Sequence, residues 1–166
     1  QYPYIRFDIA EKPMPRRLAV EAKGLRKGYE HTLFARVDLA IEAGERVAII
    51  GPNGIGKTTL LMCLAGRLAP DAGTVAWAEK ATLGLCMQEH TADFPDDMPL
   101  TEWMGQWKSA NDDDQIVRAT LGRLLFSGDE TKKSVKVISG GEERRMIFGK
   151  LTLQQPNVML MDEPTN

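Results

Sequence analysis

The sequence predicts an α/β fold with a parallel-sheet core, and two kinds of pattern carry this prediction. Short apolar runs at Val47–Ile50 and Val158–Met161 are typical of strands that a parallel sheet buries on both faces. Between these runs, an apolar stripe indicates an amphipathic helix, and its residues are Leu60, Leu61, Leu64 and Leu68. Helical segments that alternate with buried strands favour an α/β fold over an all-helical or all-β one.

The N-terminal part is expected to contain a linker and then two strands. Residues 1–16 include three prolines and little periodicity, which is typical of a linker tail, so the domain is expected to occupy 17–166. Alternating apolar residues from Leu18 to Ala22 predict a strand at a sheet edge. The segment Val37–Ile41 alternates in the same way and predicts another strand.

The middle of the chain alternates between predicted strands and helices. A helix is expected to begin near Gly56, and strands are expected around Thr74–Trp77 and Thr82–Met87. Residues 98–134 have helical patterns, with Asn111 as an N-cap. The three aspartates that follow Asn111 suit the positive end of a helix dipole, which explains the acidic run without a metal ion.

Composition and charge limit the classes of function. The 166 residues are 43% hydrophobic and 27% charged, as in a globular domain or a piece of a larger one. No eighteen consecutive residues are apolar, so the sequence predicts no transmembrane helix. The net charge of −2 argues against binding polyanions through overall charge alone. Cys63 and Cys86 lie in apolar runs and form no disulfide framework, so a cytoplasmic location is expected.

Residues 51–58 match the phosphate-binding loop pattern in full. Its glycines allow the backbone to wrap around phosphate oxygens with N–H groups pointing inward, and the following helix directs its positive end at the same anion. Lys57 is expected to reach the β- and γ-phosphates of a nucleotide, and the Thr58 hydroxyl to ligate Mg²⁺. The candidate nucleotide-binding residues of this segment are Gly51, Pro52, Asn53, Gly54, Ile55, Gly56, Lys57, Thr58 and Thr59.

Two acids follow the last predicted strand. Asp162 and Glu163 come directly after Val158–Met161, and parallel sheets bind ligands at the carboxyl ends of their strands. Asp162 is therefore expected to hold the Mg²⁺ shell, and Glu163 to orient and polarise an attacking water. The alternative is a chance acidic turn after a core strand.

A glycine pair marks the start of a further predicted helix, which runs to about Leu153. Ser139, Gly140 and Gly141 would offer a hydroxyl, free N–H groups and a helix dipole to an anion. Taken alone, these residues are interpreted by default as an ordinary helix N-cap with its loop.

These motifs together resemble an ABC-type ATPase domain. The phosphate-binding loop, Gln88, Ile138–Glu142 and Met161–Asn166 occur in the order and spacing of that family. The resemblance implies a P-loop NTPase fold. Its expected parts are a parallel-sheet core, an antiparallel β edge and a helical subdomain at about 98–138, in a domain incomplete at its C-terminus.

The resemblance also implies roles for individual residues. Tyr29 corresponds to the aromatic residue that stacks on adenine, the alternative being a packed surface tyrosine. Gln88 resembles the glutamine that contacts Mg²⁺ and the attacking water, and otherwise would be an ordinary strand-end amide. The signature residues Ser139, Gly140, Gly141 and Glu142 would face an ATP held by a second domain.

The implied activity is Mg²⁺-dependent ATP hydrolysis with Glu163, Gln88 and Lys57 as catalytic residues and with Thr58, Gln88 and Asp162 around the metal. Because two such domains sandwich two ATP molecules, this chain alone is expected to be inactive or weak.

Details of the motifs resemble the ABC-F group, and the stretches 102–108 and 121–127 resemble the second ATPase domain of its YbiT-like members. Glu142 replaces the glutamine usual in transporters, and Thr165 and Asn166 follow Glu163-Pro164. The resemblance implies a cytoplasmic protein with two ATPase domains, no membrane domain, and the ribosome and its RNA as partners. Residues 1–16 would then end the linker between the two domains.

Other interpretations stay open at this point. A membrane transporter's ATPase subunit and a regulatory or DNA-repair ATPase are the alternative functions. Trp103 and Trp107 stand four residues apart, as in a buried helical pair or in a pair that contacts a partner.

Overall fold

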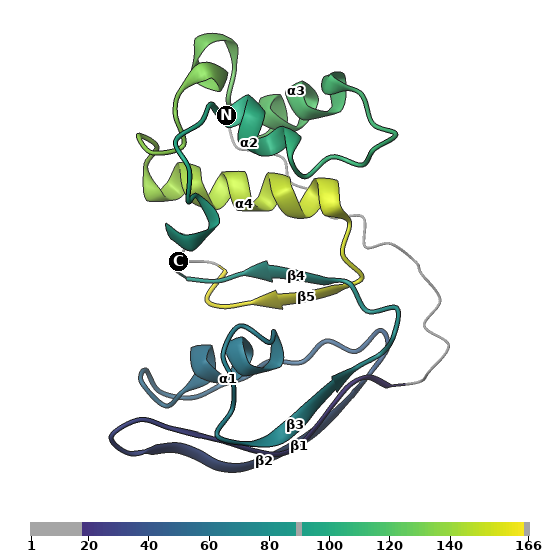
Figure 1. The fold of residues 1–166 in the computed structure, drawn as a ribbon, viewed down its shortest axis with the longest axis vertical. Helices are drawn as coiled ribbons and strands as arrows, with labels where there is room; N and C mark the ends of the chain where they lie inside the picture. Colours follow the sequence, from purple (N-terminus) through teal and green to yellow (C-terminus); the bar gives the residue numbers. More distant parts are fainter. Residues whose placement is uncertain (1–17, 89–90, 165–166) are drawn as a thin grey trace.

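The computed structural model describes residues 18–88 and 91–164, and it has helices and two small sheets stacked in layers (Figure 1). The expected linker tail at 1–16 and the motif residues Thr165 and Asn166 lie outside the described residues. An α/β architecture is therefore confirmed over the described ranges.

The first sheet has three antiparallel strands, β1 (Leu18–Gly28), β2 (Thr32–Glu42) and β3 (Ala72–Trp77). Their order is β2-β1-β3, so β1 is the central strand and its predicted place at a sheet edge is wrong. Sequence alternation reports that one face of β1 is buried, but it carries no information on which neighbours pair with the strand's two edges. Gly73 allows β3 to lie close beside β1, because a Cβ at Gly73 would lie 2.5 Å from the carbonyl oxygens of Lys23 and Gly24.

The second sheet is the parallel pair of β4 (Leu83–Cys86) and β5 (Val158–Met161), in which Leu83 lies opposite Val158. The buried strand predicted at Val47–Ile50 is wrong, because this segment forms no strand and the side chains of Val47 and Ile50 are 60% and 91% exposed. A strand needs a neighbour to hydrogen-bond with, and no strand among the described residues pairs with this segment.

Helix α1 (Lys57–Leu64) lies between the two sheets (Figure 1). Its Leu64 packs in one cluster with Ala22 and Leu25 of β1, and Leu160 of β5 contacts the same cluster. The helix ends before Gly66, whose φ of 69° is left-handed and stops further helical turns. Leu68 was predicted to belong to the helical stripe, and this is wrong because it lies beyond that end. By burying its stripe on both sides, α1 fixes its N-terminus next to the carboxyl end of β5.

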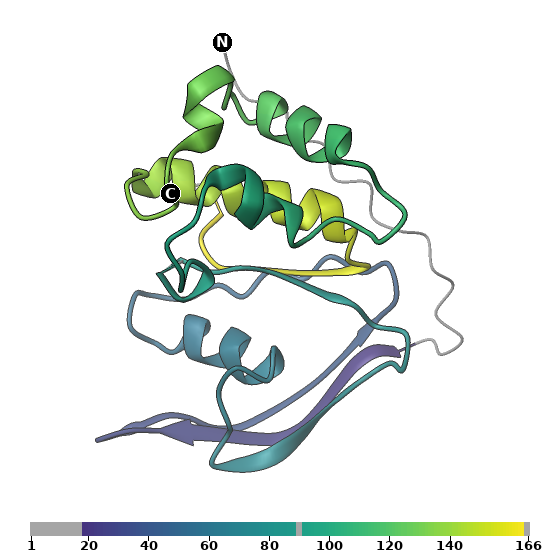
Figure 2. The ribbon, with the colours of Figure 1, turned by 45° about the horizontal axis from the view of Figure 1, so that its top comes forward.

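The remaining helices cover the other face of the parallel pair (Figure 2). Helix α4 (Gly140–Gln154) lies on the β4–β5 sheet, and α2 (Leu100–Gly105) and α3 (Asp114–Arg123) lie over α4. Short 3₁₀ turns η1 and η2 occupy Thr91–Asp93 and Gly128–Lys132.

A single apolar cluster holds the helical part together, and it includes Trp103, Leu121, Met146 and Ile147. At Gly149 a Cβ would lie 2.5 Å from the terminal methyl of Met104, so α2 and α4 are in close contact. The expected subdomain at about 98–138 contains α2, α3 and η2, and its exact bounds stay a prediction.

The N-cap predicted at Asn111 is wrong. Helix α3 begins at Asp114, and Asp113 caps it by accepting hydrogen bonds from the backbone N–H groups of Gln115 and Ile116. Every residue of the run 111–114 is a good cap by type, so the tertiary placement of the preceding loop selects the position.

Candidate functional site

The phosphate-binding loop lies directly before α1. Gly54 and Gly56 have φ angles of 82° and 104°, a left-handed backbone that other residues rarely adopt. Gly56 also packs against β2, because a Cβ there would lie 3.3 Å from the Cβ of Leu33. The loop is therefore fixed in a curled conformation between β2 and the N-terminus of α1.

A cavity of about 340 Å³ opens at this loop. Its lining residues are Leu33, Asn53, Gly54, Gly56, Lys57, Thr58, Thr59, Gln88 and Glu163. Most of the predicted nucleotide residues therefore share one cavity with Gln88 and Glu163, which come from segments far apart in the sequence. Gly51, Pro52 and Ile55 belong to the loop without lining the cavity. Leu33 was missed by sequence reasoning, because no pattern links it to the loop until the fold packs it against Gly56.

Lys57 directly follows the curled loop and is the first residue of α1. Its Nζ donates hydrogen bonds to the carbonyl oxygens of Gly51 at 2.9 Å and Pro52 at 3.1 Å. These bonds place a full positive charge inside the loop, beside the N–H groups at the helix start. The loop, the lysine and the helix dipole together present a positive potential suited to a polyphosphate.

Thr58 and Asp162 connect the loop to the end of β5. The Thr58 hydroxyl donates a 2.6 Å hydrogen bond to Oδ2 of Asp162, whose side chain is only 4% exposed. A buried carboxylate needs a donor or a cation, and the donor here is Thr58, the residue predicted to share the metal with it. Thr58 lines the cavity, and Asp162 lies behind it, hydrogen-bonded to the Thr58 hydroxyl without lining the cavity itself.

The oxygen donors fit Mg²⁺ better than a transition metal. The described residues contain no cluster of three or more His, Cys, Asp or Glu that could hold a metal by themselves. Mg²⁺ typically takes one or two protein oxygens and completes its shell with phosphate oxygens and water. Thr58, Asp162 and the nearby amide of Gln88 match that requirement, so these residues would hold the ion.

Glu163 follows Asp162 and lines the cavity. Its φ of 46° is left-handed, a conformation that costs a non-glycine residue about 1–3 kcal/mol. The two successive carboxylates at the end of β5 therefore differ in their surroundings. Asp162 is buried and hydrogen-bonded to Thr58, whereas Glu163 lines the cavity.

Tyr29 lies in the turn between β1 and β2 and does not line the cavity in this structure. Its side chain is 68% exposed, and the Lys27 ammonium lies 5.7 Å from the centre of its ring. The strand that follows this turn reaches the cavity, because Leu33 is a lining residue. Tyr29 is thus an exposed aromatic ring in the turn before that strand, and its stacking on a base stays a prediction.

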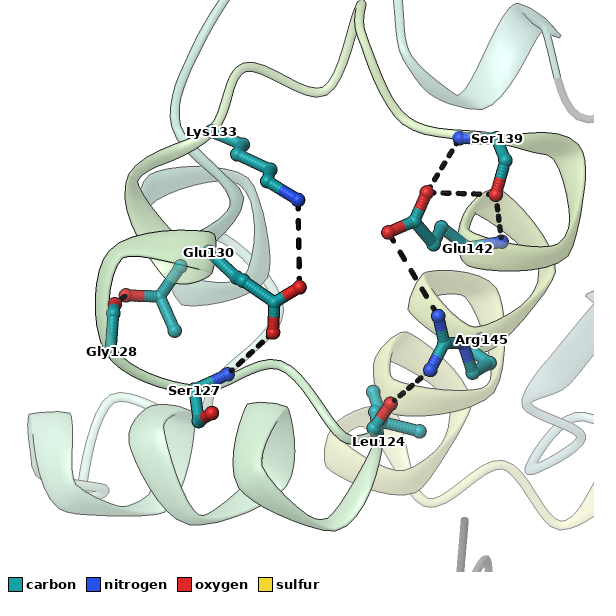
Figure 3. Close-up of polar contacts among 9 residues, drawn as sticks. Leu124, Ser127, Gly128, Glu130, Lys133, Ser139, Glu142 and Arg145 are labelled. Atoms are coloured by element: carbon teal, nitrogen blue, oxygen red, sulfur yellow. Dashed lines mark hydrogen bonds and ion pairs between the residues drawn. The ribbon is translucent and has the colours of Figure 1, made fainter. Parts of the chain in front are cut away.

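Ser139 caps α4 in a capping box with Glu142 (Figure 3). The Glu142 carboxylate accepts hydrogen bonds from the backbone N–H of Ser139 at 2.8 Å and from its hydroxyl at 2.7 Å. These bonds hold the pKa of Glu142 below its usual value, and the bond from the backbone N–H of Ser139 has the larger effect. Arg145 lies 3.9 Å from the same carboxylate and donates to the Leu124 carbonyl oxygen, which ties the helix start to the end of α3.

The structure does not bring Ser139–Glu142 to the cavity of this chain. None of these residues lines it, and Ser139, Gly140 and Gly141 are exposed. A Cβ on Gly140 or Gly141 would meet nothing within 4 Å, so packing within the described chain does not require glycine at either position.

The tryptophan pair is part of the core. Trp103 is fully buried, its indole N–H donates to the carbonyl oxygen of Asp93 at 3.0 Å, and its ring centre lies 5.7 Å from that of Trp107. The Trp107 ring is covered by Lys150, whose ammonium lies 4.2 Å from the ring centre. The buried-pair interpretation is therefore the one that this geometry supports.

Comparison with known proteins gives a consistent match. A family described as "ABC transporter" matches residues 34–166. The chain is 52% identical over its whole length to the Escherichia coli O157:H7 "Probable ATP-binding protein YbiT" and spans 31% of that protein. It is 35% identical over 96% of its length to the "Putative ATP-binding protein YdiF" of Bacillus subtilis (strain 168), of which it spans 25%. Over 90% of the chain it is 37% identical to Arabidopsis thaliana "ABC transporter F family member 2", of which it spans 22%.

A solved structure shares the fold. It is the dimeric post-hydrolysis state of an ATP-binding cassette bound to ADP and Pi, with a TM-score of 0.70 and 20% identity. The match covers 88% of this chain and 74% of the other. The predicted P-loop NTPase fold of the ABC type is confirmed, and so is the resemblance to YbiT-like proteins.

Proposed function

Because this chain belongs to the ABC transporter family, we propose that it binds Mg²⁺ and ATP and hydrolyses the nucleotide as one domain of a longer ABC-F protein. The observation that carries this proposal is the hydrogen bond from Thr58 to Asp162, because Thr58 lines one cavity together with Lys57, Gln88 and Glu163. This bond joins the phosphate-binding loop to the end of a strand more than a hundred residues away. It supports a site in which groups for phosphate, metal and water act together.

Each residue of the cavity has a distinct task in this proposal. Lys57 exchanges its hydrogen bonds to Gly51 and Pro52 for the β- and γ-phosphates. Thr58, Asp162 and Gln88 hold Mg²⁺, which neutralises charge on the phosphates when bound. Glu163 accepts a proton from the attacking water as the water attacks the γ-phosphorus and ADP leaves. Tyr29 stacks on the adenine.

The exposed start of α4 supports a second ABC domain in the full-length protein. Ser139, Gly140 and Gly141 offer a hydroxyl and N–H groups to an anion, but they are exposed and do not line this chain's own cavity. An ATP held by another domain would satisfy them, and the chain spans only about a third of the length of the YbiT protein. The chain on its own would then hold half of each of two sites and turn over ATP weakly, since positioning and charge stabilisation supply most of the rate.

We further propose that the full-length protein is a cytoplasmic factor that acts on the ribosome and its RNA. The similarity to F-group relatives supports this branch over an ATPase subunit of a membrane transporter. No helix among the described residues is long and apolar enough to cross a membrane.

A gradient experiment tests this proposal. Full-length protein that carries Glu163→Gln and the matching change in its sister domain should trap ATP and sediment with ribosomes. Only the closed form with ATP bound would present the surfaces that fit the ribosome. The association should weaken with salt, because ribosomal RNA attracts basic surface. If the trapped protein stays at the top of the gradient or appears in the membrane pellet, the ribosome assignment is wrong and transport takes its place.

A further inference from the structure

The turn that carries Tyr29 is short and tightly built. Tyr29 donates its backbone N–H to the carbonyl oxygen of His31 at 3.0 Å, and Gly28 lies opposite Thr32 where β1 pairs with β2. A Cβ on Gly28 would lie 2.9 Å from the same His31 oxygen. These contacts fix the backbone that carries Tyr29 at the end of β1.

Asp71 holds that end of β1 from another part of the chain. It lies on the segment between α1 and β3, and its backbone N–H donates to the Arg26 carbonyl oxygen at 2.8 Å. Its carboxylate accepts one hydrogen bond from the Gly28 backbone N–H at 2.9 Å and another from the Lys27 ammonium at 2.7 Å. Three successive residues before Tyr29 are thus bound to one aspartate.

Lys27 links this aspartate to the aromatic ring. Its side chain is only 13% exposed, and the ammonium that Asp71 fixes lies over the Tyr29 ring, 5.7 Å from its centre. Each group favours the charged form of the other: the hydrogen bond to Asp71 raises the pKa of Lys27, and the bond from Lys27 lowers the pKa of Asp71. The Lys27 cation occupies one face of the Tyr29 ring, so the other face is available to stack on a base.

We propose that Asp71 is a positioning residue for the nucleobase: by binding Gly28 and Lys27 it fixes the Tyr29 ring in the turn before β2, the strand whose Leu33 lines the phosphate cavity. This inference rests on the proposed function, in which Tyr29 stacks on adenine. It assigns a specific task to a carboxylate that contacts neither phosphate nor metal. Changing Asp71 should therefore lower the affinity for a ligand that has a base and spare the affinity for the phosphates alone.

Paired ligands test the assignment. One ligand is ATP and the other is inorganic tripolyphosphate, each with Mg²⁺, because tripolyphosphate has the phosphates without the base. Calorimetry would measure both affinities in full-length protein whose sister domain carries alanine at its phosphate-loop lysine, so that binding reports this site.

The test variant is Asp71→Asn, which keeps an acceptor for Gly28 but directs an uncharged amide at Lys27. The matched control is Asp38→Asn on the same sheet, where the carboxylate also binds a backbone N–H, that of Gly24 at 2.6 Å, and a cation, Arg36.

Complete loss of a base–aromatic stack corresponds to about 5- to 150-fold in affinity, and loosening the ring should cost part of that. Asp71→Asn is expected to lower the affinity for ATP about 3- to 10-fold and to keep the affinity for tripolyphosphate within about twofold of that of the unsubstituted protein. Asp38→Asn should change neither. In a Tyr29→Ala background, Asp71→Asn should have no further effect on ATP, because the two residues act through the same contact.

Three results would overturn the proposal. Equal losses for ATP and tripolyphosphate would show that Asp71 supports the whole site and not the base. An ATP affinity unchanged by Asp71→Asn would show that the ring needs no fixing. If Tyr29→Ala leaves ATP affinity unchanged while tripolyphosphate still binds, the positioning role falls and the phosphate site stands. Failure of the unsubstituted domain to bind either ligand would refute the proposed function itself.

Discussion

Replacing Thr58 by valine removes one hydroxyl at the centre of the site while keeping the shape of the side chain. Thr58 donates a 2.6 Å hydrogen bond to Asp162, a carboxylate that is 4% exposed. A hydrogen bond to a charged group contributes about 1.5–3 kcal/mol, and its loss leaves the buried carboxylate with weaker compensation. At about 2–4 °C per kcal/mol, the melting temperature of this domain should fall by roughly 3–12 °C.

The same substitution should weaken ATP binding only when Mg²⁺ is present. In the proposed site, the hydroxyl leaves Asp162 and ligates the ion when the metal and nucleotide bind. Thr58→Val should therefore lower the ATP affinity with Mg²⁺ by about 10- to 100-fold, which corresponds to about 1.5–3 kcal/mol. With EDTA in place of Mg²⁺, the affinity should stay within about threefold of the unsubstituted protein.

Calorimetric titration with and without Mg²⁺ makes this comparison. Thr58→Ser keeps the hydroxyl and should restore most of the Mg²⁺-dependent affinity, while Thr59→Val makes the same chemical change on the neighbouring residue of α1. An equal loss in Mg²⁺ and in EDTA would refute the reasoning, since it would show that the hydroxyl only supports the fold of the loop.

Three further predictions concern the loop lysine and the start of α4. Lys57→Ala should weaken ATP binding by more than about tenfold, because a charge-assisted contact to the phosphates is lost; an unchanged affinity for a fluorescent ATP analogue would contradict the site. Ser139→Ala should lower the free energy of unfolding by about 0.5–2 kcal/mol, the usual cost of an N-cap, in chemical denaturation. The Glu142 pKa is lower in the folded state than its ordinary value of 4.5, so its stabilising effect is complete above that value and is lost as the pH falls through the folded pKa. Glu142→Gln should accordingly reduce the loss of stability on acidification below about pH 5, and an unchanged pH profile would count against the capping box.

The site was predictable where it depends on local pattern. The phosphate-binding loop needs glycine at positions of left-handed backbone and a lysine at the helix start, and Gly54, Gly56 and Lys57 meet these needs in eight consecutive residues. The cap at Ser139 is likewise a relation between residues three positions apart, here with Glu142. Such features are visible in a sequence because their partners are neighbours along the chain.

Features that depend on distant partners were missed. The apolar run Val47–Ile50 has the composition of a buried strand, yet it needs a strand alongside it, which the described residues do not supply. The contacts of Asp71 with Lys27 and Gly28 join residues more than forty positions apart, and an aspartate in a turn gives no sign of them. Leu33 enters the cavity only through its packing on Gly56.

Hydrolysis at Glu163 is the central claim, and a single-turnover measurement tests it directly. In full-length protein whose sister domain already carries glutamine at the matching position, the remaining release of phosphate from γ-labelled ATP reports this site. Glu163→Gln removes the charge and the proton acceptor but keeps the shape of the side chain. ATP should stay bound while the rate falls by roughly 10²–10⁴-fold, the range for losing a general base. A rate equal to that of the protein with Glu163 intact would contradict the account and place the base elsewhere.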